Sequence, residues 1–181
     1  MVYDGLRGAA ATKGWQIEGD SVLSEALIHR PVTIKGREHD VPVEIVRASA
    51  LHTLATSAFI APPIGFPFEV STEGVKGAIA SALGIEDLQI GDEAFDREFR
   101  LLSKEPDKLK QLLTREVQAV IKELGEEAKP LTTHFRITES VVWIQRPSWG
   151  TLTEEEVLRD VPLCVRAAKT IQAAATAAHL T

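Results

Sequence analysis

Residues Gly91–Leu102 read GDEAFDREFRLL, and this segment sets phenylalanines and leucines among acidic side chains. Gly91 and Asp92 indicate a turn. Beyond it, Phe95, Phe99 and Leu101 predict a strand with its apolar side chains directed inward. The intervening charged residues would then face outward, and these are Asp96, Glu98 and Arg100.

Two helices and a hairpin are expected downstream of this segment. Ser103 opens the first helix, with Pro106 in its first turn, where a missing N–H costs nothing. Thr114 caps a second helix that Gly125 ends, so a break is expected near Thr114. Residues 131–137 and 140–145 then alternate as two strands of a hairpin.

The last segment predicts an amphipathic helix. Thr153 and Glu156 have the spacing of a capping box. Pro162 should kink or split the helix, because proline removes a backbone hydrogen bond and clashes with the preceding turn. The apolar face is mostly small and is either core or a surface for self-association. Its residues are Val157, Val161, Cys164, Ala168, Ile171, Ala175 and Ala178.

The residues upstream of the segment predict strands. Val41, Val43 and Ile45 alternate with polar or proline residues, as in a half-buried strand. A connection at residues 36–39 would join this strand to residues 32–34 as a hairpin. Three further strands are expected, at residues 22–29, 51–61 and 66–70. A helix is expected at residues 73–83.

These elements predict one α+β domain over residues 1–181, with a β-rich half at about 14–72 and a mixed half at about 73–181. We expect an antiparallel sheet, curved or in two layers. It would pack against the C-terminal helix and the broken helical pair.

Composition excludes several functional classes. The net charge of −6 disfavours nucleic acid and anionic membrane as partners. No apolar run approaches 18 residues, so no membrane span is expected, and the N-terminus does not read as a signal peptide. The single cysteine, Cys164, fits a reducing compartment, which favours the cytoplasm.

The sequence motifs of common catalytic sites are absent. The chain has no H-E-x-x-H, C-x-x-C, G-x-S-x-G or phosphate-binding glycine pattern. We therefore assign no catalytic residue and no cofactor. Cys164 lies on the apolar helix face, where a free cysteine behaves as a small hydrophobe.

Acidic residues form the first candidate site, because residues 86–98 hold six acids and one base. Oxygen ligands at this density suit a divalent cation, for which Asp92, Glu93 and Asp96 are the candidates. The alternative is a solvated turn. The spacing does not match a calcium-binding loop, which favours the alternative.

Arg146 and Trp149 form the second candidate, in the loop between the predicted hairpin and the final helix. An exposed tryptophan beside an arginine has the composition of an interface anchor. The alternative is that Trp149 folds back as a lid on the core, as large aromatic side chains usually do.

The segment also resembles bacterial domains of unknown function that carry G-D-x-x-F-D-x-x-F. Here the pattern runs from Gly91 to Phe99, and residues 112–117 (LLTREV) match the helix that follows in those sequences. The resemblance covers about residues 6–174, implies the same order of hairpin and final helix, and transfers no active residue.

We therefore predict a non-enzymatic binding or protein-interaction module. Its partner would be another protein or a second copy of the chain. The alternative is a small-molecule-binding or hydrolytic enzyme whose site is assembled from separate strands near His52, His134 and the acidic turn.

Overall fold

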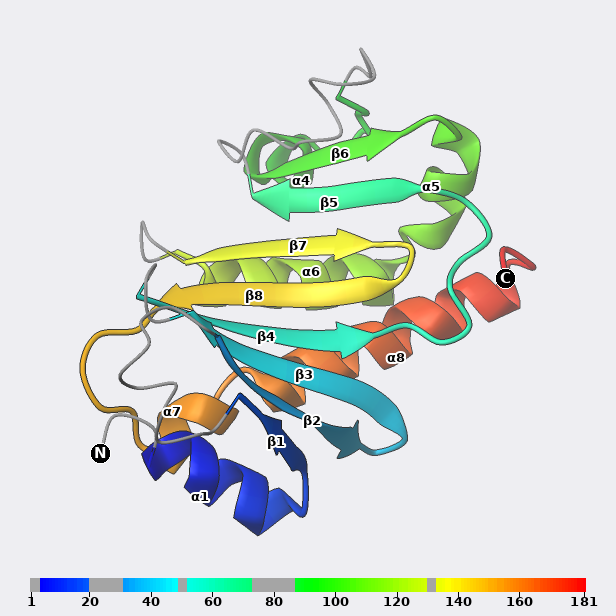
Figure 1. The fold of residues 1–181 in the computed structure, drawn as a ribbon. Helices are drawn as coiled ribbons and strands as arrows, with labels where there is room; N and C mark the ends of the chain where they lie inside the picture. Colours follow the sequence, from blue (N-terminus) through cyan, green and yellow to red (C-terminus); the bar gives the residue numbers. More distant parts are fainter. Residues whose placement is uncertain (1–3, 20–30, 49–51, 73–86, 130–132) are drawn as a thin grey trace.

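The computed structural model describes residues 4–19, 31–48, 52–72, 87–129 and 133–181. Their strands form one antiparallel sheet in the order β1-β2-β3-β4-β8-β7-β5-β6 (Figure 1). The α+β prediction is confirmed, and the strands lie in a single sheet. The strands are β1 (Gln16–Glu18), β2 (Val32–Glu38), β3 (Val41–Ala48), β4 (Thr53–Phe59), β5 (Phe68–Thr72), β6 (Phe99–Ser103), β7 (His134–Thr138) and β8 (Val141–Pro147).

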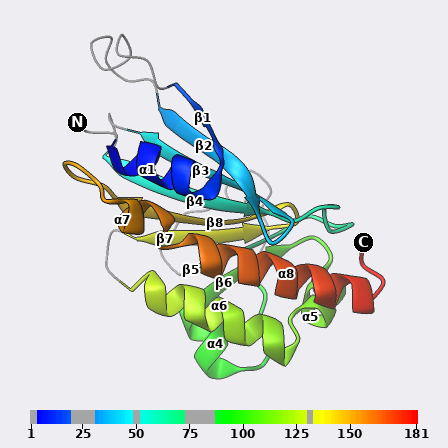
Figure 2. The same cartoon turned by 90° about the horizontal axis from the view of Figure 1, so that it is seen from below.

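Helices cover one face of this sheet, and in Figure 2 the described helices lie on the same side of it. The C-terminal helix α8 crosses β3, β4 and β8 and packs beside α6, while α1 packs against α7. The helices are α1 (Asp4–Lys13), α4 (Glu93–Glu98), α5 (Pro106–Leu112), α6 (Arg115–Glu127), α7 (Glu154–Leu158) and α8 (Val161–Ala177).

Strand β3 shows how the sequence encodes this arrangement. Val41, Val43 and Ile45 are buried toward the helices, and Pro42 and Glu44 between them are half-buried on the other face. An antiparallel sheet tolerates such a solvated face, and the two-residue period follows from it. The core therefore lies between the sheet and its helical layer.

The strand predicted from Phe95 begins four residues later, at Phe99. Asp92 caps a short helix, α4, because its carboxylate accepts hydrogen bonds from the backbone N–H groups of Ala94 and Phe95, each at 3.1 Å. Phe95 and Phe99 still enter the core together, with their ring centroids 4.7 Å apart. Asp96 and Glu98 therefore belong to a helix, and the prediction of a strand there is wrong.

The helical pair breaks at Thr114, as expected. Its hydroxyl accepts a hydrogen bond from the N–H of Val117 at 3.3 Å and so caps α6. Gly125 does not end this helix, which continues to Glu127. A Cβ at Gly125 would lie 2.7 Å from Cε1 of Phe99, so the glycine makes room for that ring.

The first hairpin turns two residues later than predicted. Strand β2 continues to Glu38, and His39 and Asp40 form the turn with φ of 48° and 67°. Positive φ at both central residues suits the twist of a two-residue hairpin. Gly36 therefore lies within β2 and not in the turn. The ring of Trp15 packs on this position, and a Cβ there would lie 2.1 Å from that ring, which leaves room only for glycine.

The C-terminal prediction is confirmed in detail. Thr153 and Glu156 form the capping box of α7, and Pro162 stands in the first turn of α8, so the proline splits the segment into two helices. The predicted apolar face is buried from Val161 to Ala175 as α8 packs against the sheet and α6, and Val157 is buried in α7, which packs against α1. That face is core, which removes it as a surface for self-association.

The two halves of the sequence share the sheet. The β7–β8 hairpin, predicted at residues 131–145, lies between β4 and β5 and joins the strands of the β-rich half. The strand expected at residues 22–29 and the helix expected at residues 73–83 lie outside the described residues.

Candidate functional site

Arg146, near the end of β8, is held within the chain. Its Nε lies 2.7 Å from Oδ2 of Asp160, and its Nη2 lies 2.7 Å from Oδ1, which makes the pair bidentate. Nη2 also reaches the carboxylate of Glu127 at 3.1 Å. The hydrogen bonds that Arg146 donates to the carboxylate of Asp160 raise the pKa of Arg146. The side chain of Asp160 is 5% exposed, so this ion pair links β8 to the start of α8 almost out of solvent.

The loop that follows Arg146 is fixed at two further points. Ser148 is buried, and its backbone N–H donates to the carbonyl of His52 at 2.6 Å. Arg47, also buried, donates from Nη2 to the carbonyl of Gly150. Gly150 has φ of 69°, a left-handed conformation that glycine adopts without strain.

Trp149 stands between these two anchored residues and is 70% exposed. The expectation that it folds back as a lid on the core is therefore wrong. Ser148 occupies the buried position in the loop, and the turn at Gly150 leads the chain away. The indole stacks on the imidazole of His52 with ring centroids 4.3 Å apart and an interplanar angle of 23°. We call this pair of rings the Trp149–His52 platform.

The two predicted binding residues thus have different surroundings. The guanidinium of Arg146 is satisfied by Asp160 and Glu127, whereas the indole of Trp149 faces solvent over most of its surface. Arg146 positions the loop, and Trp149 is the side chain that the loop presents.

The acidic turn uses its carboxylates to bind its own backbone. Asp96 accepts hydrogen bonds from the N–H groups of Ile90 and Gly91, both at 2.9 Å, and Asp87 accepts one from Leu101 at 2.8 Å. The backbone hydrogen bond from Phe95 lowers the pKa of Asp92.

The three cation candidates have separate surroundings. Asp92 caps α4 and pairs with Lys122 at 3.4 Å, Asp96 faces the turn backbone, and Glu93 lies exposed on α4. Within the described ranges, no group of three or more His, Cys, Asp or Glu side chains is placed to hold a metal ion.

The residues of the alternative enzyme site do not converge. His52 stacks under Trp149 beside β4, and His134 lies on β7, opposite Gln145 of β8. The acidic turn precedes β6, at the far edge of the sheet. Cys164 is buried with Sγ 3.8 Å from the carbonyl of Thr56, and burial raises the pKa of its thiol.

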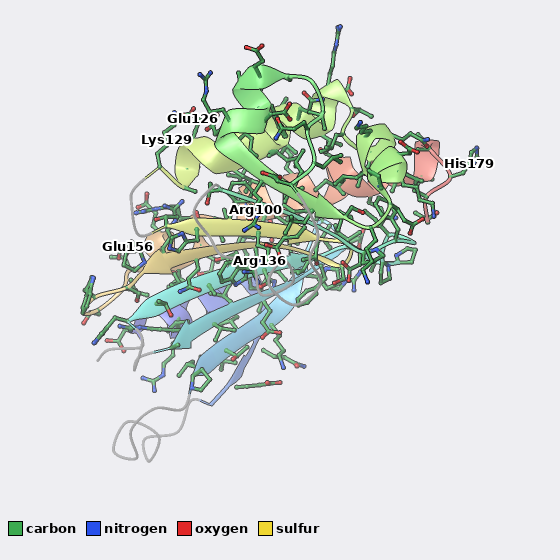
Figure 3. The ribbon with its side chains drawn as sticks, turned by 90° about the horizontal axis from the view of Figure 1, so that it is seen from above. Arg100, Glu126, Lys129, Arg136, Glu156 and His179 are labelled. Carbon is green, nitrogen blue, oxygen red and sulfur yellow. The ribbon has the colours of Figure 1, made fainter. Side chains whose placement is uncertain are left out.

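One polar row was missed by the sequence analysis. Strand register places Arg100, Ser71, Arg136 and Trp143 side by side on the sheet face opposite the described helices, and Figure 3 labels Arg100 and Arg136 among them. Glu69, two residues from Ser71 and 1% exposed, lies 3.6 Å from Nε of Arg136. The alternation in FEVST of β5 was the available signal, because it puts Glu69 and Ser71 on one face.

Comparison with known proteins identifies the fold. No family model and no curated protein matches the chain. A solved structure, the mycobacterial trehalose monomycolate transport factor A, TtfA, is similar with a TM-score of 0.58. The likeness covers 94% of this chain and 93% of that one at 11% sequence identity, which shows a shared fold. The resemblance to domains with the G-D-x-x-F-D-x-x-F pattern stays a prediction.

Each helix that the structure describes is too short or too polar to cross a lipid bilayer.

Proposed function

We propose that this protein is a non-enzymatic protein-interaction module of the bacterial cytoplasm, and that the Trp149–His52 platform is its contact point. The observation that carries the proposal is the 70% exposure of Trp149 in a loop held at both ends. An exposed tryptophan loses little conformational entropy on binding when its loop is already fixed.

The chemistry of the platform supports a protein partner. Tryptophan dominates the energetic centres of protein interfaces, because one side chain brings a large apolar area with a single N–H donor. The imidazole of His52 supports one face of the indole, and the hydrogen bonds at Ser148 and Gly150 hold the backbone on either side of it. Partner binding would bury both rings.

The structural neighbour and the cysteine support the remaining parts of the proposal. The structural neighbour is a mycobacterial transport factor, which favours a bacterial protein that acts by contact with other molecules. The only cysteine is a free thiol buried on α8, as suits a reducing compartment.

Site-specific photo-crosslinking in the cell of origin tests the proposal. A photoreactive phenylalanine analogue at position 149 should give a discrete adduct, identified by mass spectrometry. The same analogue at Lys110, an exposed residue of α5, is the control. With the purified partner, Trp149→Ala should weaken binding about tenfold or more and Trp149→Phe much less.

Three outcomes decide the proposal. An adduct with another protein or with a second copy of the chain supports an interaction module. Crosslinked adducts of equal yield from positions 149 and 110 overturn the proposal that the Trp149–His52 platform is the contact point. A purified chain that turns over a metabolite, with activity lost on changing His52 or His134, overturns the non-enzymatic assignment.

A further inference from the structure

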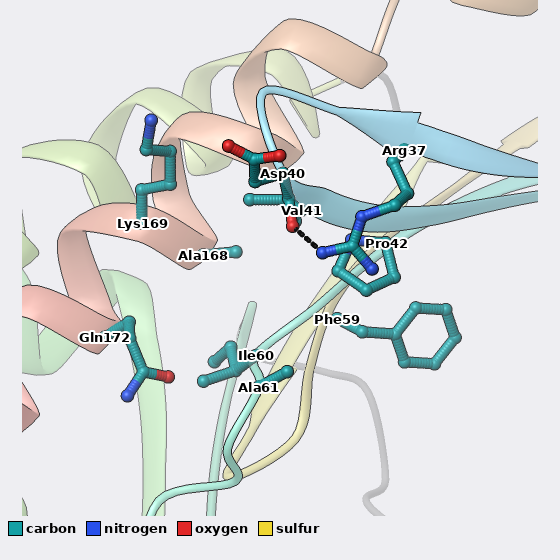
Figure 4. A pocket seen from close by; sticks show the side chains of 10 residues that line it. All are labelled: Arg37, Asp40, Val41, Pro42, Phe59, Ile60, Ala61, Ala168, Lys169 and Gln172. Carbon is teal, nitrogen blue, oxygen red and sulfur yellow. Dashed lines mark hydrogen bonds between the residues drawn. The ribbon is translucent and has the colours of Figure 1, made fainter.

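A groove lies at the opposite end of β4 from Trp149, between the β2–β3 hairpin and α8 (Figure 4). Its volume is about 230 Å³. The strand from Thr53 to Phe59 separates the two places, which sets them about 20 Å apart. The groove and the platform are therefore different sites.

The floor of the groove is apolar and partly open to solvent. Val41, Ile60 and Ala168 form its buried part. Phe59 is 37% exposed at its edge, and it and Trp149 are the exposed large hydrophobic side chains of the described residues. Phe59 ends β4 and Trp149 stacks beside its start, so these two exposed aromatic residues point to two separate contacts.

A second hollow, of about 480 Å³, extends this groove along α8. It shares Lys169 with the first and lies between the same hairpin and the preceding turns of the helix. Pro162, Val165 and Thr170 line it from the helix. From Pro162 to Gln172 the helix rises about 15 Å, which suits a ligand several residues long.

Two polar groups in the groove have no partner among the described residues. Oε1 of Gln172 is buried and accepts no hydrogen bond, which leaves an amide dipole unmatched beside an apolar floor. Lys169 makes no ion pair there, whereas Glu38 of the adjoining hollow is paired with Lys13 at 3.0 Å and Arg166 with Glu123. The groove therefore offers an acceptor and a cation over apolar surface.

We propose that this groove binds an extended acidic peptide segment of another protein. An apolar side chain of the peptide packs on Phe59 and Ile60, a backbone N–H donates to Gln172, and a carboxylate pairs with Lys169. An ionised fatty acid would match the floor with its chain and Lys169 with its carboxylate, but it has no N–H or O–H to donate to Gln172. A nucleic acid would bring a phosphate charge with every nucleotide past the carboxylate of Asp40 at the rim, whereas the proposed peptide places a single carboxylate at Lys169.

Peptide selection tests the proposal on the whole chain. The probe is a display library of peptides of about eight residues, which extend to about 27 Å. Selection on the unaltered chain, followed by counter-selection on Lys169→Glu, should enrich peptides with an acidic residue near a large apolar one. A synthetic peptide of that consensus then serves for titration.

Matched variants give the expected changes in affinity. Lys169→Glu should weaken consensus binding at least about tenfold, because a repulsion replaces an attraction. Gln172→Leu should weaken it about fivefold to tenfold by leaving the peptide N–H unpaired. Lys110→Glu makes the same charge change on exposed α5 and should leave binding unchanged. Circular dichroism and thermal melting establish that each variant is folded.

The results separate this groove from the other possibilities. Loss of peptide binding on Trp149→Ala, with Lys169→Glu harmless, would assign the peptide to the platform and overturn the groove. Absence of any consensus would also overturn it. So would Lys169-dependent binding of vesicles of anionic phospholipid in place of peptide, or Lys169-dependent dimerisation in sedimentation. Peptide binding that survives Trp149→Ala supports the groove even if the platform finds no partner.

Discussion

Replacing Arg146 by leucine should destabilise the protein by about 3–5 kcal/mol, the usual cost of breaking a buried ion pair from one side. Asp160 would keep its charge with its side chain 5% exposed and would lose its bidentate partner. The second contact, to Glu127, adds little, because the carboxylate of Glu127 is 53% exposed and such pairs contribute at most about 1 kcal/mol.

Chemical denaturation at pH 7, followed by circular dichroism, measures this loss. The double variant Arg146→Leu/Asp160→Leu should recover most of it, because apolar side chains of similar size often replace a buried pair at little cost. Trp149→Ala is the control from the same loop and should change stability by no more than about 0.5 kcal/mol, since its side chain is mostly exposed.

Two results would refute this reasoning. One is a loss below about 1 kcal/mol for Arg146→Leu, which would make Arg146 an exposed residue free to bind a partner. The other is a double variant no more stable than the sum of its single variants predicts, which would show that the two side chains are not coupled.

Three further predictions concern local features. Gly125→Ala should destabilise by about 1–2 kcal/mol in denaturation, because crowding Phe99 outweighs the helix propensity of alanine; a stabilised variant would contradict this. Hydrogen bonds from Thr153 lower the pKa of Glu156, so its contribution to stability is full above its unfolded pKa of 4.5 and is lost as the pH falls below it. Glu156→Gln should therefore reduce the loss of unfolding free energy as the pH falls below about 4.5, measured by denaturation at several pH values. An unchanged pH dependence would show that the capping box is not its source. Cys164 should resist thiol reagents until the protein unfolds, as timed by mass spectrometry; fast labelling of the native chain would contradict its burial.

Local patterns predicted local structure well. The spacing of Thr153 and Glu156, the position of Pro162 and the alternation in Val41–Ile45 each follow from interactions within a few residues. The sequence around Phe95 was ambiguous, because residues spaced by four, such as Phe95 and Phe99, share one face of a helix and also one face of a regular strand. The hydrogen bonds of Asp92 decide for the helix, and Asp92 could have been identified as its cap.

Long-range placement could not be predicted in the same way. Nothing in residues 134–147 says that their hairpin will enter the sheet between β4 and β5, because that choice depends on the fit of whole strands. Gly125 illustrates the same limit. Its sequence position indicates a helix end, while its actual role depends on Phe99, twenty-six positions away in the sequence.

The platform combines both kinds of information. The sequence identified Trp149 as either an interface anchor or a lid on the core. The residue types of its loop could not decide between these two roles. The decision rests on residues that come from separate segments: Arg47, His52, Arg146 and Asp160. Arg47 and His52 bind the loop backbone at Gly150 and Ser148, on either side of Trp149, and the Arg146–Asp160 ion pair anchors the end of β8 before the loop. A loop that served only to connect β8 with α7 would not require the buried Arg47 and the bidentate ion pair of Arg146 to hold it, so these contacts favour a role for the ring that they expose.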